Sequence, residues 1–133
     1  MIALYSSNRI QCFFYSQKTT AGGETMRSTV EYQNGILTIR LIGELDHAAA
    51  SAAMNAVEMA VEEYMPRQCV LDFSDLSFMD SSGIAVILKS ERLMRQMGGG
   101  TAIQSANAQV MRVLEIAGLA AMIQDSKKEC GKI

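Results

Sequence analysis

The feature that most constrains the fold of this chain is a change in the spacing of its apolar residues after Ile42. Before that point, Leu37, Ile39 and Leu41 alternate with polar residues, which predicts a strand with one buried face. From Ala48 onward, apolar residues such as Ala53, Val57 and Ala60 recur at the three-to-four-residue spacing of an amphipathic helix, which predicts that they share its buried face. A chain with both periods must pack helices on a sheet, which indicates an α/β domain.

Two short strands joined by a tight turn should come first. Asn34-Gly35 separates the alternating segment from an earlier one, and Asn-Gly is the strongest short-range signal for a two-residue hairpin. We therefore expect antiparallel strands at 28–33 and 36–42, followed by a loop at 43–47.

Helices and strands should then alternate. A helical crossover separates each later strand from the next, so these strands should be parallel. The expected order is a helix at 48–64, a strand at 69–73, a loop at 74–80, a helix at 81–97, a strand at 101–104, a helix that Asn107 can cap and a short strand at 122–123. Residues 84–88 are apolar nearly all round, so we expect this part of the second helix to be buried. The predicted fold is an α/β sandwich with a mixed sheet of four to five strands, the first two antiparallel and the later ones parallel, packed with three to four helices.

Composition excludes several classes of protein. A length of 133 residues suits about one domain, and a net charge of -2 argues against a nucleic-acid binder. No apolar stretch approaches the roughly 20 residues of a membrane span. The three cysteines are scattered and His47 is the only histidine, so we expect no metal site and no cofactor. Unpaired thiols suit a reducing compartment, which predicts a cytoplasmic protein.

The ends of the chain differ from its centre. Residues 1–25 are mixed in composition and rich in Ser, Thr and Gln, so we expect a disordered leader before a domain at 26–124 and a polar tail at 125–133. Residues 22–26 can be encoded by GGA GGT GAA ACA ATG, which is a bacterial ribosome-binding site, a spacer and a start codon. Native translation therefore starts either at Met26 or at Met1, and the amino-terminal sequence of the native protein would decide between them.

The segment Met79-Asp80-Ser81-Ser82-Gly83 stands immediately before the apolar second helix. Asp80 or Ser81 can cap that helix by accepting hydrogen bonds from its first amides, which is worth about 1 kcal/mol. Capping does not explain a pair of serines, nor a glycine in the first turn, where glycine costs about 1 kcal/mol relative to alanine. Gly83 would let the backbone of a partner, or a phosphate, approach closely.

Enzymatic interpretations of this segment are weak. A hydrolase would use one of the serines as nucleophile and His47 as base, but the surrounding residues are not GxSxG. A phosphoaspartate receiver would use Asp80 as acceptor. Glu44 and Asp46 could imitate its acidic pair, but the required lysine is missing after the later strand. A nucleotide-binding domain is disfavoured because glycines 98–100 end a helix instead of opening one.

The segment 71–88, LDFSDLSFMDSSGIAVIL, resembles the signature of the STAS domain, which is named for sulphate transporters and anti-sigma factor antagonists. The segment 41–47, LIGELDH, resembles the first conserved loop of the antagonist branch. The glycines at 98–100 and the segment 113–119 also fit. The resemblance covers residues 26–123 and implies the STAS-type sandwich.

The resemblance also implies a function that is not catalytic. The unmodified form of such a protein binds an anti-sigma factor, which then releases its sigma factor. The anti-sigma factor is also a serine kinase that phosphorylates the first serine of the pair, here Ser81, with Ser82 as the second candidate. A PP2C-type phosphatase removes the phosphate. The implied process is transcription regulation in bacteria by partner switching.

The expected partner-binding surface combines two segments of the chain. Asp46 should contribute from the first segment, and Asp80 flanks the acceptor serine in the second. The full expected set is Glu44, Asp46, His47, Asp80, Ser81, Ser82 and Gly83. The alternative is a phosphorylation-independent STAS adaptor subunit of a larger regulatory or transport assembly. The serine pair and the Glu44–His47 segment favour the antagonist.

Overall fold

The computed structural model describes residues 2–6, 9–14 and 26–124. Its strands are β1 (Ile2–Ser6), β2 (Arg9–Phe14), β3 (Arg27–Gln33), β4 (Ile36–Leu45), β5 (Gln68–Asp72), β6 (Leu76–Met79), β7 (Gly100–Gln104) and β8 (Ile123–Gln124). Its helices are α1 (His47–Tyr64), α2 (Ser81–Gln96) and α3 (Ala108–Ile116), with a short 3-10 helix, η1 (Ala120–Met122). The three to four helices that the sequence predicts are therefore found in the described part of the chain.

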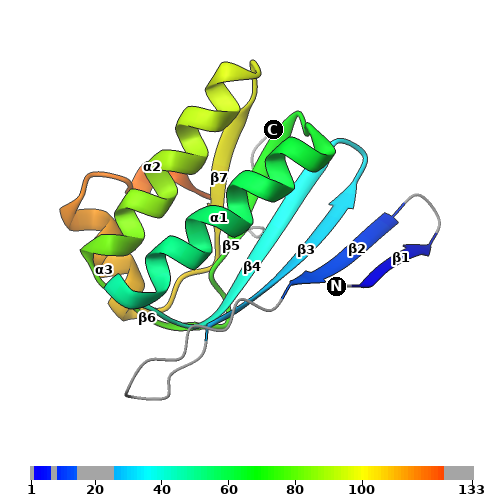
Figure 1. The fold of residues 1–133 in the computed structure, drawn as a ribbon. Helices are drawn as coiled ribbons and strands as arrows, with labels where there is room; N and C mark the ends of the chain where they lie inside the picture. The colour runs from blue at the N-terminus through cyan, green and yellow to red at the C-terminus, as the bar shows by residue number, and fades with distance from the viewer. Residues whose placement is uncertain (1, 7–8, 15–25, 125–133) are drawn as a thin grey trace.

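The described strands form one mixed sheet in the order β1-β2-β3-β4-β5-β7-β8, with β6 beside β4 (Figure 1). Strands β1 to β4 pair antiparallel in succession, whereas β4 pairs in parallel with β5 and with β6. The remaining pairs, β5 with β7 and β7 with β8, are also parallel. The predicted α/β class and the change from antiparallel to parallel pairing are confirmed. The sheet is wider than predicted because β1, β2 and β6 are additional strands.

The hairpin between β3 and β4 follows its sequence signal. Asn34 and Gly35 both have positive φ angles, 53° and 82°, as a type I′ turn requires. Leu37, Ile39 and Leu41 of β4 are each 0% exposed. The period-two pattern therefore identified the buried face of the central strand.

Helices α1 and α2 lie side by side on one face of the sheet, and both begin at the same end of it (Figure 1). Ala53 and Val57 of α1 and Val86 of α2 are fully buried between them and the strands. The expectation that residues 84–88 are buried all round is wrong, since Leu88 is 47% exposed. A helix that packs on a sheet buries only one stripe, so an apolar residue on its other side faces solvent.

The expectation of a disordered leader is wrong for residues 2–6 and 9–14, which form β1 and β2. Strand β2 pairs along the whole of β3, from Arg9 opposite Gln33 to Phe14 opposite Ser28. Without β2, strand β3 would present a row of unpaired backbone groups at the edge of the sheet, and pairing satisfies them. The predicted tail at 125–133 lies outside the described residues.

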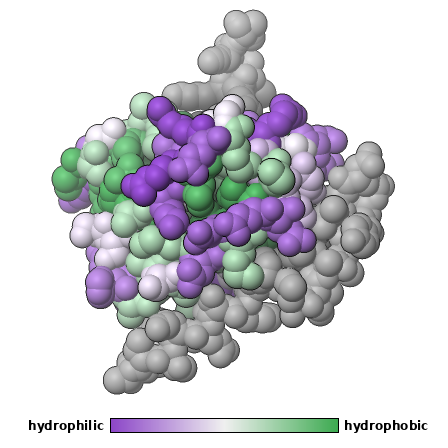
Figure 2. Space-filling model, turned by 45° about the horizontal axis from the view of Figure 1, so that its top comes forward, coloured by the Kyte–Doolittle hydropathy of each residue, from purple (hydrophilic) through white to green (hydrophobic). Residues whose placement is uncertain are grey.

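The face drawn in Figure 2 shows hydrophilic side chains interspersed with smaller apolar areas. The large apolar residues that are exposed come from several elements: Ile36, Met59, Met65, Phe78, Leu88, Met97 and Ile116. Within the described part of the chain, each helix is too short or too polar to cross a membrane.

Candidate functional site

Strand pairing brings the two segments of the candidate site together. The expected loops at 43–47 and 74–80 are wrong over most of their length, because β4 continues to Leu45 and β6 lies within the second loop. Leu45 pairs with Met79 in parallel, after a bulge between Gly43 and Glu44. As each strand leads directly into a helix, α1 and α2 start next to each other. The ladder hydrogen bonds that β4 and β6 gain favour this extended pairing over two free loops.

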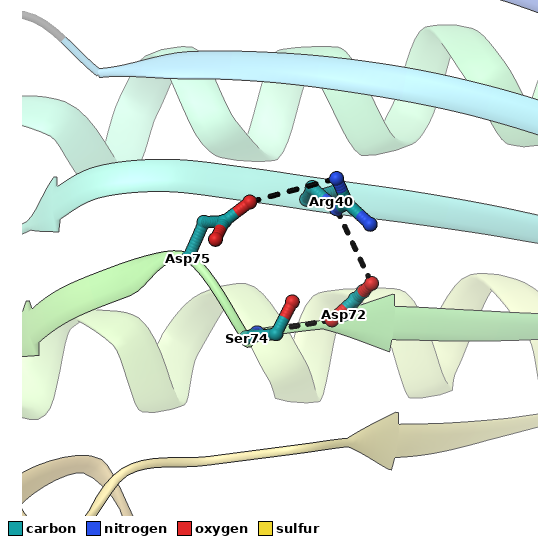
Figure 3. Close-up of polar contacts among 4 residues, drawn as sticks. All are labelled: Arg40, Asp72, Ser74 and Asp75. Carbon is teal, nitrogen blue, oxygen red and sulfur yellow. Dashed lines mark hydrogen bonds and ion pairs between the residues drawn. The ribbon is translucent and has the colours of Figure 1, made fainter.

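A polar cluster fixes the connection from β5 to β6 (Figure 3). The carboxylate of Asp72, a residue only 5% exposed, accepts hydrogen bonds from Arg40 Nε at 3.3 Å and from the Ser74 amide at 2.9 Å. Arg40 also pairs with Asp75 at 3.5 Å, and the Asp75 carbonyl accepts a hydrogen bond from the Gly43 amide. These contacts set where β6 begins relative to β4.

Aspartates cap both helices at the site. Asp80 accepts a hydrogen bond from the Ser82 amide at 2.8 Å, and Asp46 accepts one from the Ala49 amide at 3.0 Å. The sequence allowed either Asp80 or Ser81 as the cap of the second helix, and the structure selects Asp80. Both carboxylates thus lie at helix N-termini, where the helix dipole favours negative charge.

The two serines have different surroundings. Ser81 is exposed, whereas Ser82 is half-buried and its Oγ lies 3.4 Å from His47 Nδ1. His47 is the first residue of α1, so this contact joins the two segments of the predicted site. Glu44 is half-buried and stands opposite Phe78 in the strand pair. The structure therefore gathers Asp46, His47 and the 80–82 segment around two adjacent helix starts.

The structure explains why position 83 is a glycine, which the sequence did not reveal. It is buried, and a Cβ added to it would lie 2.3 Å from Met79 Cγ and 3.2 Å from Leu45 Cδ2. Carbon atoms cannot approach to 2.3 Å without a covalent bond, so only glycine lets α2 lie this close to the end of β6. Internal packing therefore explains the glycine, rather than the close approach of a partner or a phosphate that the sequence suggested.

Sequence reasoning missed that two amide side chains at the start of α3 bind the backbone of β6. Asn107 caps α3 as predicted, but its Nδ2 also donates to the Leu76 carbonyl at 3.1 Å. Gln109 accepts a hydrogen bond from the Met79 amide at 3.0 Å and donates to the Met79 carbonyl at 2.9 Å. A single glutamine in the first turn of an amphipathic helix carries no sequence signal for such a role.

A family model described as the STAS domain matches residues 27–130. The chain belongs to this family. This STAS domain is 38% identical over 90 residues to the anti-sigma F factor antagonist of Paenibacillus polymyxa, covering 68% of this chain and 77% of that protein. It is 29% identical over 93 residues to the anti-sigma F factor antagonist of Lysinibacillus sphaericus, covering 70% of this chain and 80% of that protein.

Solved structures agree with the family assignment. The anti-sigma factor antagonist SpoIIAA in its unphosphorylated form matches this STAS domain with a TM-score of 0.68 at 29% identity, covering 77% of this chain and 90% of that chain. The phosphorylated form of SpoIIAA, described as a Bacillus cell fate determinant, matches with a TM-score of 0.61 at 28% identity, covering 77% of this chain and 93% of that chain. Both forms of SpoIIAA therefore share the fold described above.

Proposed function

We propose that this STAS domain is an anti-sigma factor antagonist that phosphorylation of Ser81 switches off. The unphosphorylated form binds an anti-sigma factor with serine kinase activity and so frees a sigma factor. A PP2C-type phosphatase restores the binding form. The role is binding and not catalysis, and it operates in the cytoplasm, where sigma factors act. The exposed Ser81 at the start of α2, in a relative of named antagonists, is the observation that carries this proposal.

Accessibility favours Ser81 over Ser82 as the phosphate acceptor. A kinase must bring the acceptor hydroxyl in line with the γ-phosphate of ATP, which requires a hydroxyl at the surface. Ser81 is exposed, whereas the half-buried Ser82 has its hydroxyl against His47. Phosphate transfer to Ser82 would break that contact.

The partner surface extends along α2 from the acceptor serine. Ser81, Ala85 and Leu88 are all exposed, and their spacing of four and three residues places them on one face of the helix. Leu88 is 47% exposed, so its side chain is available for contact with a partner. Apolar contacts with a polar rim are typical of protein interfaces, and Asp46 and Asp80 would supply part of that rim.

The charge of the phosphate is sufficient to act as the switch. A phosphoserine carries about -1.5 to -2 charges at neutral pH. The first amides of α2 and its dipole tolerate an anion, so the domain should stay folded. A hundredfold loss of affinity needs about 2.7 kcal/mol. Two like charges about 5 Å apart at an effective dielectric of about 20 repel by roughly 3 kcal/mol, so a single acidic group of the partner at that distance would be enough for the whole effect.

The test compares Ser81→Ala, Ser81→Asp and the matched control Ser82→Ala. The purified chain is incubated with its cognate anti-sigma kinase and labelled ATP, and affinity for the kinase is measured separately. We expect Ser81→Ala to bind without being labelled, Ser81→Asp to bind at least tenfold more weakly, and Ser82→Ala to behave as the wild type. Labelling of Ser81→Ala at the wild-type rate would refute the assignment and point to Ser82. A wild-type chain that binds its partners but is never labelled would instead be the phosphorylation-independent adaptor.

A further inference from the structure

Strand β6 has one edge without a strand partner. In the part of the chain that the structure describes, β6 pairs only with β4. In a parallel pair, the backbone groups of successive residues point alternately to the two sides of a strand. At the end of β6 the Asp80 amide donates to the Leu45 carbonyl of β4 at 3.3 Å, so the N–H and C=O of the preceding residue, Met79, point to the other side of the strand. The hydrogen-bond partners of the Met79 backbone must therefore come from the other edge of β6.

Two side-chain amides from α3 occupy that edge. Gln109 makes both an accepted and a donated hydrogen bond to Met79, at 3.0 and 2.9 Å, as a neighbouring strand would. Asn107 donates to the Leu76 carbonyl while its Oδ1 accepts from the Val110 amide at 2.8 Å. Val110 is fully buried, so the start of α3 is anchored in the core and holds both amides in place.

Met79 transmits this constraint to the acceptor serine in two ways. Its backbone precedes Asp80, whose carboxylate caps α2, and Ser81 follows. Its side chain packs beneath Gly83 in the first turn of the same helix. A displacement of Met79 would therefore move both the cap and the first turn of α2, and with them the Ser81 hydroxyl.

We infer that Gln109, supported by Asn107, is a positioning residue that holds the Met79–Ser81 backbone in the orientation in which Ser81 accepts phosphate. The effect on phosphate transfer rests on the proposed function, whereas the hydrogen bonds between Gln109 and Met79 do not depend on it. Gln109 is outside the set of residues that the sequence indicated. It acts on the rate of phosphate transfer, because misplacement of a reacting group by about 1 Å lowers rates by up to about a hundredfold.

Three variants separate the two hydrogen bonds. Gln109→Met keeps the length of the side chain and removes both bonds. Gln109→Glu keeps an oxygen that accepts from the Met79 amide but loses the donor to the Met79 carbonyl. Gln96→Met makes the same substitution of glutamine by methionine at an exposed residue at the end of α2, and it serves as the control.

The first measurement is amide hydrogen exchange by NMR on the full chain. We expect the Met79 amide to exchange on the order of tenfold faster in Gln109→Met, to stay protected in Gln109→Glu, and to be unchanged in Gln96→Met. The amide of Leu71 in β5 should not change in any variant, which separates a local effect from global unfolding. Unchanged exchange of Met79 in Gln109→Met would overturn the inference whether or not a kinase acts on the chain.

The second measurement is the kinetics of Ser81 phosphorylation by the cognate anti-sigma kinase. We expect kcat to fall roughly tenfold in Gln109→Met with little change in KM, because Ala85 and Leu88, the part of the proposed kinase-binding face beyond the first turn of α2, stay in place. A smaller fall is expected in Gln109→Glu, and none in Gln96→Met. Faster exchange with an unchanged kcat would overturn the positioning role. If the wild type itself takes no phosphate, the proposed function fails, and hydrogen exchange alone decides whether Gln109 holds the strand.

Discussion

Gly83 in the first turn of α2 lies directly against the side chain of Met79 at the end of β6. A Cβ at position 83 would lie 2.3 Å from Met79 Cγ and 2.5 Å from its sulfur, and Met79 is 0% exposed. The buried methionine has little room to retreat, because the interior is close-packed. The position of the helix that carries Ser81 thus depends on the absence of one methyl group.

Gly83→Ala should destabilise the domain even though alanine is the better helix former. Alanine gains about 1 kcal/mol of helix propensity. Overpacking against Met79 costs about 1–3 kcal/mol, so we expect a net loss of about 1 kcal/mol in the free energy of unfolding. Urea denaturation would measure it. The control is Gly100→Ala, since nothing lies within 4 Å of a Cβ at that position. Equal urea midpoints for the two variants would contradict the packing explanation.

Asp72 should matter more for stability than Asp75, although both contact Arg40. The Asp72 side chain is 7% exposed and also accepts from the Ser74 amide, whereas the Asp75 side chain is 52% exposed. Removing a buried acceptor costs about 1–3 kcal/mol, while an exposed ion pair contributes about 0–1 kcal/mol. We expect Asp72→Ala to lower the thermal midpoint clearly and Asp75→Ala to leave it nearly unchanged. A larger fall in the thermal midpoint for Asp75→Ala than for Asp72→Ala would show that the exposed carboxylate contributes more to the stability of the cluster.

Leu88→Lys should weaken binding to the anti-sigma factor without unfolding the domain. Leu88 is 47% exposed on the same face of α2 as Ser81, so a lysine there is solvated in the free protein but disrupts an apolar contact in the complex. We expect a loss of roughly tenfold or more in affinity, as for a central interface residue. Ile116→Lys, on α3 at an 82% exposed position, is the matched control and should bind as the wild type. Titration calorimetry would measure both, and equal affinities would place Leu88 outside the interface.

Cys69 should make the domain less stable in alkaline solution. Burial raises the pKa of the Cys69 thiol from 9.0 to about 12. Above pH 9 the unfolded chain therefore loses this proton while the folded chain retains it, so stability falls as the pH rises towards 12. We expect the free energy of unfolding to fall by on the order of 1 kcal/mol per pH unit more in the wild type than in Cys69→Ala. Parallel pH profiles for the two proteins would show that the folded thiol ionises normally.

Elements with strong local patterns could be predicted from the sequence. Asn34-Gly35 specified the hairpin because its type I′ turn needs positive φ angles at both residues. The regular spacing of Ala53, Val57 and Ala60 identified the buried face of α1. Asn107 was identified as the cap of α3, and Asp80 as one of two candidate caps of α2. Each of these features depends on residues that are close in the sequence.

Features that depend on distant partners could not be predicted. Strand β6 is only four residues long, and its pairing with the end of β4 has no local signal. The same holds for β1 and β2, because the mixed composition of residues 1–25 resembled that of an unstructured leader. The exposure of Leu88 was missed because periodicity cannot show which side of an apolar helix meets the sheet.

By itself the sequence determined the alternation of strands and helices, the hairpin, and a pair of serines at the start of an apolar helix. Only the tertiary structure decided which groups surround those serines. The contact of Ser82 with His47 spans 35 positions and the contact of Gln109 with Met79 spans 30. Such contacts exist only after β6 has docked beside β4 and α3 has packed against β6, because chain connectivity over such distances leaves the partners free to lie anywhere until the core forms.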